Sequence, residues 1–237
     1  MRRGPALRRR LLLPTAVLVL AGAALAEIPP LPADLATHGW AELRFDGKRP
    51  NRYEALGADG IRLISDGSVS MAFRPVAAEL SSTPLLTWRW RVLESGPPTA
   101  LDVRGEDDRP AAVYVGFPYD PARASLWERM RRAVVELRQG ADAPGKVLVY
   151  VWGGKRPAGA TFESPYMGES SSNRVLRSGD APTGMWFEER VDLAADFVAS
   201  FGYPAPDPTR IAVSADSDDT ASRSVAEIEG LVFAERP

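Results

Sequence analysis

The sequence predicts an all-β (β-rich) protein: a β-sandwich or jelly roll with one or two short helices. Two observations favour this fold class. Roughly ten short stretches alternate apolar and polar residues or are rich in β-branched residues, and turns rich in Gly and Pro separate them. One segment has a strong helical repeat, so the regular alternation of strands and helices that an α/β fold needs is missing.

Residues 1–26 are predicted to be the cleaved signal peptide of a bacterial exported protein. Five arginines precede an apolar stretch, and Ala24-Leu25-Ala26 fits a signal peptidase site. Pro14 and Gly22 interrupt the apolar stretch, which disfavours the alternative of a retained membrane anchor. We therefore expect a periplasmic or secreted protein that begins at Glu27 and has no membrane span after processing. The arginines also fit a loose twin-arginine signal, so the export route stays open.

The composition excludes several classes of function. The chain has 29 Lys and Arg and 31 Asp and Glu; residues 1–26 hold five of the arginines and no acid, which leaves 24 basic and 31 acidic residues, a net charge of −7. Nucleic acids and anionic lipids are therefore poor candidate partners. The chain has no cysteine and one histidine, His38, which excludes disulfides, thiolate metal sites and multi-histidine zinc sites. We expect His38 to lie in a solvated loop.

A Pro-rich lead-in at 27–39 is expected to precede a single β-sandwich domain at 40–237. The sequence Asp66-Gly67-Ser68 has the chemistry of a hairpin turn between two strands. Strands are expected at 40–45, 53–56, 61–65, 69–74, 86–92, 111–117, 146–152, 173–177, 186–191, 211–215 and 228–233.

The strongest strand signal is the run 86–92, where apolar and polar residues alternate without a break. Successive side chains of a strand point to opposite faces, so Trp88 and Trp90 share one apolar row, with Arg89 and Arg91 on the reverse. Each indole needs roughly 150–250 Å² of cover, so we expect the tryptophan row to face a thick core.

The first helix is predicted to begin at Ser125, which forms a capping box with Glu128, and to end at Gly140. A second, shorter helix is expected at 193–201, ended by Gly202. Apolar residues recur at helical spacing in the first helix, and we expect this stripe to be buried against the rest of the protein. The stripe consists of Leu126, Trp127, Met130, Ala133, Val134 and Leu137.

A ligand-binding surface is predicted on the face of the sheet opposite the core. The strand at 146–152 is expected to pack its valines inward, so its aromatic residues would face the other way. If the strands are neighbours, this surface combines Arg89, Arg91, Tyr114, Tyr150 and Trp152, with Gly116 leaving a hollow. Aromatic rings stack on sugars, and Arg binds carboxylate or phosphate. The alternative is that a second layer, such as the first helix, covers this face.

A candidate metal site lies between the last two strands, where hard oxygen ligands crowd in one turn. Such ligands suit Ca²⁺, so the candidates are Asp216, Asp218, Asp219 and Thr220. The spacing up to Glu227 matches an EF-hand loop, but Ala221 stands where that loop requires glycine and the flanks are strands, so we reject an EF-hand. The alternative is a turn rich in Asp and Ser that binds no metal.

Asp107 and Asp108 end a long polar loop at 94–110 and are further candidate ligand-binding residues. They are expected either to add carboxylates to the same end of the sandwich as the acidic turn or to be solvated. A glycosidase would need two acids facing one cleft about 5–10 Å apart. The chain has no nucleophile elbow, P-loop or dinucleotide motif.

The chain resembles a bacterial family of exported proteins known as domain-of-unknown-function family 3047. The resemblance covers nearly the whole mature chain and implies a secreted sandwich similar to galactose-binding or carbohydrate-binding modules, with no assigned activity. It rests on Ser65-Asp66-Gly67-Ser68, Leu86-Thr87-Trp88-Arg89-Trp90-Arg91-Val92, Asp107-Asp108, Val113-Tyr114-Val115, Tyr150-Val151-Trp152, Val175-Leu176-Arg177-Ser178-Gly179, Asp196-Phe197, Phe201-Gly202 and Asp216-Ser217-Asp218-Asp219-Thr220.

Two hypotheses of function follow. The first is a non-enzymatic protein of the cell envelope that binds a glycan or another polar polymer. The second is a hydrolase of envelope polysaccharide or ester that uses the loop carboxylates Asp107, Asp108, Asp216 and Asp218. Enzyme motifs are weak throughout, which favours the first hypothesis.

Overall fold

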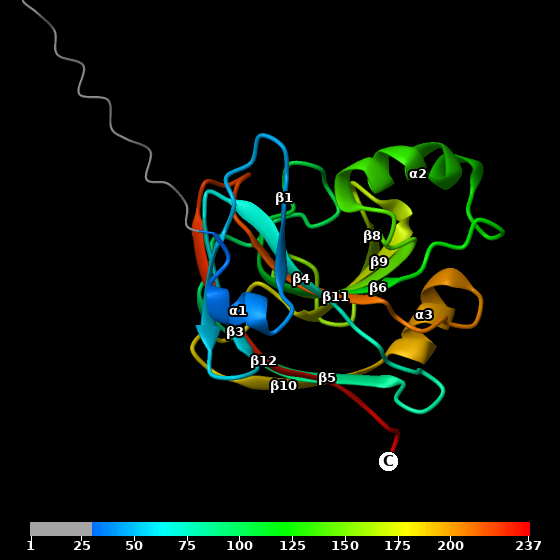
Figure 1. Cartoon of the computed structure of the whole chain (residues 1–237). Helices are drawn as coiled ribbons and strands as arrows, with labels where there is room; N and C mark the ends of the chain where they lie inside the picture. The colour runs from blue at the N-terminus through cyan, green and yellow to red at the C-terminus, as the bar shows by residue number, and fades with distance from the viewer. Residues whose placement is uncertain (1–29) are drawn as a thin grey trace, which may run out of the picture.

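The computed structural model describes residues 30–237, so the predicted signal peptide and its cleavage site lie outside the described residues. Residues 30–237 form two β-sheets that pack face to face, together with three short helices (Figure 1). The predicted fold class, a β-rich two-sheet sandwich of jelly-roll type, is therefore confirmed.

The larger sheet has seven strands, and the smaller has five. Strands β7 and β9 of the larger sheet pair in parallel, and the other neighbours pair antiparallel. The spatial order of the larger sheet is β1 (Ala41–Arg44), β4 (Val69–Pro75), β11 (Arg210–Asp216), β6 (Arg109–Phe117), β7 (Lys146–Trp152), β9 (Gly168–Arg177) and β8 (Thr161–Ser164). The order of the smaller sheet is β10 (Phe187–Asp192), β5 (Leu85–Glu94), β12 (Arg223–Ala234), β3 (Gly60–Asp66) and β2 (Arg52–Leu56).

The tryptophan row of β5 points into the core between the two sheets, as predicted. The rings of Trp88 and Trp90 meet edge to face with centroids 5.5 Å apart. Trp90 makes a second such contact at 5.5 Å with Trp152 of β7, in the opposite sheet. Edge-to-face pairs of buried rings add about 0.5–1.5 kcal/mol beyond their area, so these contacts tie the two sheets together.

The predicted orientation of β7 is wrong. The residues of β7 that face the core are Leu148, Tyr150 and Trp152, and its valines face the other side of the larger sheet. Both rows are buried, because β7 is an inner strand that is covered on both faces. When both side-chain rows of a strand are buried, the alternation of residues cannot show which row faces the core between the sheets.

Helix α2 (Leu126–Gln139) has the predicted capping box: Glu128 N donates to Ser125 Oγ, and Ser125 N donates to the Glu128 carboxylate. Its apolar stripe is not buried, however, which corrects our expectation. Trp127 is 59% exposed and Leu137 is 87% exposed. Polar contacts hold the helix instead, because Glu128 accepts hydrogen bonds from Lys146 Nζ and Ser170 Oγ, both at 2.8 Å.

The other two helices pack against the core. Helix α1 (Ala33–Thr37) lies within the Pro-rich lead-in and was not predicted; its Leu35 is buried. Helix α3 (Leu193–Phe201) ends at Gly202 as predicted, and the Phe197 ring lies 4.6 Å from that of Phe117. Within the described residues, no helix is long and apolar enough to cross a membrane.

Candidate functional site

A groove of about 810 Å³ lies on the outer face of the seven-stranded sheet, which points away from the five-stranded sheet. Its floor contains Met71 of β4, Ala212 of β11, Tyr114 of β6 and Val149 of β7. Ala212 lies opposite Tyr114, and Tyr114 lies opposite Val149, so strand register places the three on one face. The valines of β7 that were expected in the core therefore form part of this floor.

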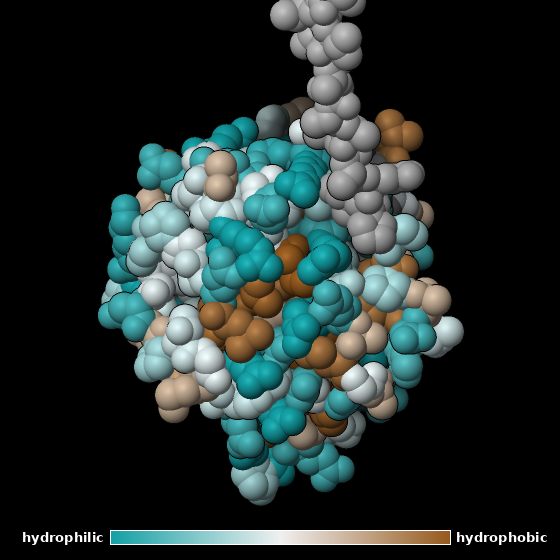
Figure 2. Space-filling model, turned by 90° about the vertical axis from the view of Figure 1, so that its left-hand side faces the viewer, coloured by the Kyte–Doolittle hydropathy of each residue, from teal (hydrophilic) through white to brown (hydrophobic). Residues whose placement is uncertain are grey.

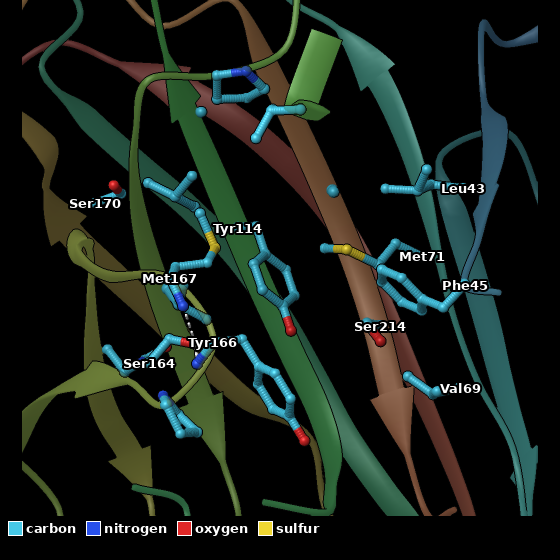
Figure 3. Close-up of a pocket in the computed structure, with 18 of the residues that line it drawn as sticks. Leu43, Phe45, Val69, Met71, Tyr114, Ser164, Tyr166, Met167, Ser170 and Ser214 are labelled. Atoms are coloured by element: carbon cyan, nitrogen blue, oxygen red, sulfur yellow. Dashed lines mark hydrogen bonds between the residues drawn. The ribbon is translucent and has the colours of Figure 1, made fainter. Parts of the chain in front are cut away.

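Two walls rise from the floor of the groove (Figure 3). Leu43 and Phe45 stand on the side of β1, beside Met71. Tyr166 and Met167, from the turn between β8 and β9, stand on the other side. The groove therefore draws its lining from segments that lie far apart in the sequence.

Helix α2 contributes a further part of the lining, which we call the roof: Trp127, Val134 and Leu137 of its apolar stripe all line the groove. Trp127 and Leu137 line it while remaining largely exposed to solvent. Apolar side chains that line a cavity without filling it are available to a ligand. On the face of the molecule shown in Figure 2, apolar residues likewise gather in a hollow that hydrophilic residues surround.

One end of the groove is acidic. Strand β11 ends at Asp216, Asp107 and Asp108 directly precede β6, and Asp218 and Asp219 follow in the turn after β11. Asp216 lies opposite Arg109, the first residue of β6, so the register of β11 and β6 brings the two loops together. One carboxylate oxygen each of Asp108, Asp216 and Asp218 lies within 4.8 Å of the other two. We refer to these five aspartates as the acidic end.

Asp108 holds the turn at 217–222 in place. Its Oδ2 accepts hydrogen bonds from Thr220 N at 2.7 Å and Thr220 Oγ1 at 2.6 Å, and its Oδ1 accepts one from Asp219 N at 3.2 Å. Charge-assisted bonds of this kind are about twice as strong as neutral ones. Thr220, predicted as a metal ligand, therefore uses its hydroxyl hydrogen to fix the loop.

Asp216 is the most perturbed acid of the described chain. Burial raises the pKa of Asp216 to about 9; Arg109 opposes the shift, and the hydrogen bond with Asp218 and the charges of Asp107 and Asp108 add to it. Burial, together with the charges of Asp218 and Asp108, also raises the pKa of Asp219. The raised pKa therefore means that the Asp216 carboxyl carries a proton at neutral pH.

Two cations face the acidic end. Arg109 Nη1 donates to the Asp107 carbonyl oxygen at 2.6 Å and lies 3.7 Å from Asp216 Oδ2, while its Nη2 donates to Tyr114 Oη at 2.6 Å. Lys48, from the loop between β1 and β2, pairs with Asp218 Oδ2. Tyr114 thus links the charged end to the apolar floor.

The structure does not bring the predicted Arg and aromatic residues onto one surface. Tyr150 and Trp152 are buried in the core and Tyr114 lines the groove, whereas Arg89 and Arg91 lie on the outer face of the five-stranded sheet. The cause is the inverted orientation of β7, combined with the placement of β5 in the other sheet. By contrast, Asp107 and Asp108 do lie at the same end of the sandwich as the acidic turn.

Arg89 and Arg91 have a different aromatic neighbour, Trp186. Their guanidinium carbons lie 4.8 Å and 4.6 Å from its ring centroid. Both arginines are also paired with acids, Arg89 with Glu229 and Arg91 with Glu227. The charges of Arg89 and Arg91 are therefore both paired within the protein.

Sequence reasoning missed most of the groove. Phe45, Met71, Phe162 and Tyr166 line it, and none of them was a predicted site residue. β8 was not predicted as a strand, so Phe162 carried no signal. Beyond Tyr114 and the aspartates, the apolar stripe of α2 gave a further hint, because an amphipathic helix needs a surface for its apolar face.

A family model described as "Protein of unknown function (DUF3047)" matches residues 38–232. No curated protein matches the chain. Among solved structures, the chain is similar to the xyloglucanase domain of NopAA, a type three effector from Sinorhizobium fredii, in complex with cellobiose (TM-score 0.46, 9% identity, 84% of this chain and 95% of that chain). It is also similar to a family 12 xyloglucanase from Bacillus licheniformis in complex with ligand (TM-score 0.42, 9% identity, 84% and 87%).

Proposed function

The chain belongs to the DUF3047 family, whose description assigns no activity, and from the geometry of its own groove we propose that it is a non-enzymatic protein that binds a glycan or a similar extended polymer. The observation that carries this proposal is the set of aromatic side chains that line one open groove from separate elements. They include Phe45, Tyr114, Trp127, Phe162 and Tyr166.

A sugar ring has an apolar C–H face and a polar rim, so its site needs aromatic surfaces next to hydrogen-bonding groups. The groove offers both. Ser164, Ser170, Asn173 and Ser214 line it among the aromatic rings. The exposed roof residues leave it open to a polymer without a large movement of the sheet.

A carboxylate-dependent hydrolase is the second candidate, and one observation favours it. Asp216 holds a proton beside Asp218, and both line the groove. A carboxyl group that is protonated at neutral pH can act as a general acid. The position of the pair argues against this role, because Asp216 is the last residue of β11 and only the end of a bound polymer would reach it.

Binding is tested by titrating a panel of soluble oligosaccharides against the protein and following heat and tryptophan fluorescence. Trp127→Ala and Met71→Arg should weaken binding at least about tenfold, or about 1.4 kcal/mol, because the first removes a roof ring and the second fills the floor. Trp186→Ala is the matched control, since it removes a tryptophan from the opposite side of the sandwich.

The outcomes separate the candidates. Loss of binding in Trp186→Ala but not in Trp127→Ala would assign the site to the outer face of the five-stranded sheet around Arg89, Arg91 and Trp186, which we call the arginine face. If the protein binds a fluorescent fatty acid but none of the oligosaccharides, the groove is a site for an apolar ligand. Turnover of a polysaccharide or ester that disappears in Asp216→Asn would establish the hydrolase.

We also propose that the protein is exported, which would give the groove access to envelope polysaccharides. The basic start and the small-x-small motif of residues 1–26 support this proposal. The intact mass of the protein recovered from cells should correspond to a chain that begins at Glu27. A mass that retains residues 1–26 would indicate a membrane anchor instead.

A further inference from the structure

The three carboxylates at the centre of the acidic end have the spacing of ligands around one ion. Asp108, Asp216 and Asp218 each present an oxygen within 4.8 Å of the other two. Ca²⁺ binds oxygens at about 2.3–2.6 Å, so two ligands on opposite sides of the ion lie roughly 5 Å apart. One ion can therefore contact all three residues without a change in the sheet.

A second observation is independent of this clustering. Asp216 Oδ1 is buried and has no hydrogen-bond partner, and the side chain is only 10% exposed. Buried polar atoms in folded proteins nearly always have a partner, since an unpaired one costs about 1–3 kcal/mol. A cation among the three carboxylates would supply the missing partner.

The cations already present do not fill this need. Arg109 is committed to the Asp107 carbonyl and to Tyr114, and it approaches Asp216 only at Oδ2, 3.7 Å away. Lys48 neutralises Asp218, but its side chain is 42% exposed and belongs to a loop. A flexible, solvated lysine can withdraw, so it competes with a metal ion for Asp218 and does not block the site.

We propose that Asp108, Asp216 and Asp218 bind a hard divalent cation, with Ca²⁺ as the best match, at the acidic end of the groove. The donors are all oxygens, which favours Ca²⁺ over zinc or copper. The hydrogen bonds from the turn at 217–222 to Asp108 fix the position of Asp108 relative to Asp218, which lies in that turn. The site stands apart from the proposed polymer-binding role, because the protein itself supplies its three carboxylate ligands.

The test is calorimetric titration of the chelator-treated protein with Ca²⁺ and, separately, Mg²⁺. We expect saturable binding of one Ca²⁺ per chain and weaker binding of Mg²⁺. Asp216→Asn, which keeps the shape of the side chain, should weaken Ca²⁺ binding at least about tenfold. Asp102→Asn is the control, because Asp102 pairs with Arg156 outside the acidic end.

Lys48→Met supplies an opposite and more telling result. Removal of the competing ammonium should tighten Ca²⁺ binding, a gain that loss of folding cannot imitate. The proposal is wrong if neither the unaltered protein nor Lys48→Met binds Ca²⁺ saturably, or if Asp216→Asn binds it as tightly as the unaltered protein. Preference for Mg²⁺ would overturn the assignment to Ca²⁺. Oligosaccharide titrations are repeated with chelator present. They measure polymer binding without the ion, so that either proposal can fail without the other.

Discussion

The outer faces of the two sheets each hold a buried carboxylate, and the two carboxylates have opposite surroundings. Glu227 of β12, on the five-stranded sheet, is 1% exposed and accepts from Arg62 Nη2 at 2.6 Å and Arg91 Nε at 2.5 Å. Burial acts to raise the pKa of Glu227, but the hydrogen bonds from Arg91 and Arg62 outweigh it and hold this pKa below its usual range.

Asp216 of β11, on the seven-stranded sheet, lacks such partners. Its neighbours are mainly other carboxylates, and one of its oxygens is unpaired. The buried acid of the arginine face is thus paired within the protein, whereas the groove face leaves apolar rings exposed and one buried carboxyl oxygen without a hydrogen-bond partner. Unsatisfied groups of this kind tend to mark functional sites, because a ligand can satisfy them. The comparison therefore favours the seven-stranded sheet as the location of the proposed site.

The largest effect should come from the core that the two faces share. Trp90→Ala should destabilise the protein by about 3–5 kcal/mol, the range for emptying a large buried site. The indole is fully buried, and its Nε1 also donates to Glu189 at 2.9 Å. Urea denaturation midpoints measure the change. Trp127→Ala, in the roof of the groove, should shift the midpoint very little, and an equal loss in both variants would mean that α2 belongs to the core.

The next effect sharpens the contrast between the two carboxylates. Glu227→Gln should cost about 2–3 kcal/mol, because it weakens hydrogen bonds to two charged groups. Asp216→Asn in chelator should change stability by less than about 1 kcal/mol, because the raised pKa leaves the Asp216 carboxyl neutral at neutral pH and the amide of Asn is neutral as well. Urea denaturation midpoints of the two variants measure both costs. A larger cost for Asp216→Asn would remove the distinction that we draw between the faces.

The pH dependence of stability should follow from Glu227. Because its folded pKa is lowered, Glu227 stabilises the fold above the unfolded pKa of Glu, about 4.3, and this contribution is lost as the pH falls through the lowered value. The stability difference between the unaltered protein and Glu227→Gln should therefore be constant from pH 7 to 5 and shrink below about pH 4. A difference that grows on acidification would contradict the assigned pairing.

Local patterns in the sequence predicted much of the fold. The alternation around Trp88 and Trp90 identified a core strand, and the pair Ser125 and Glu128 identified the start of α2, because each signal lies within a few residues of its structural consequence. The orientation of β7 could not be predicted, since both of its faces are buried. Local alternation cannot distinguish two buried rows.

The candidate site was harder to predict for a related reason. The sequence showed the aspartates as two clusters. It left open whether Asp107 and Asp108 lie at the same end of the sandwich as Asp216 or are solvated. The groove itself depends on the order of strands in the larger sheet, where β1 and β8 lie at opposite edges. Residues such as Phe45 and Phe162 meet across a groove only once that order is known, and single side chains carry no information about it.

The smallest effect provides a matched test within the arginine face. Arg89 and Arg91 lie on one face of β5 and contact the same Trp186 ring, but Arg89 pairs with Glu229, whereas Arg91 pairs with the buried Glu227. Arg89 is 52% exposed in its side chain, so Arg89→Ala should cost less than about 1 kcal/mol, as exposed ion pairs do. Arg91→Ala should cost about 1.5–3 kcal/mol, because it takes a charged hydrogen bond from a buried acid. Equal midpoints would mean that the Trp186 contact, and not the burial of the acid, stabilises this face.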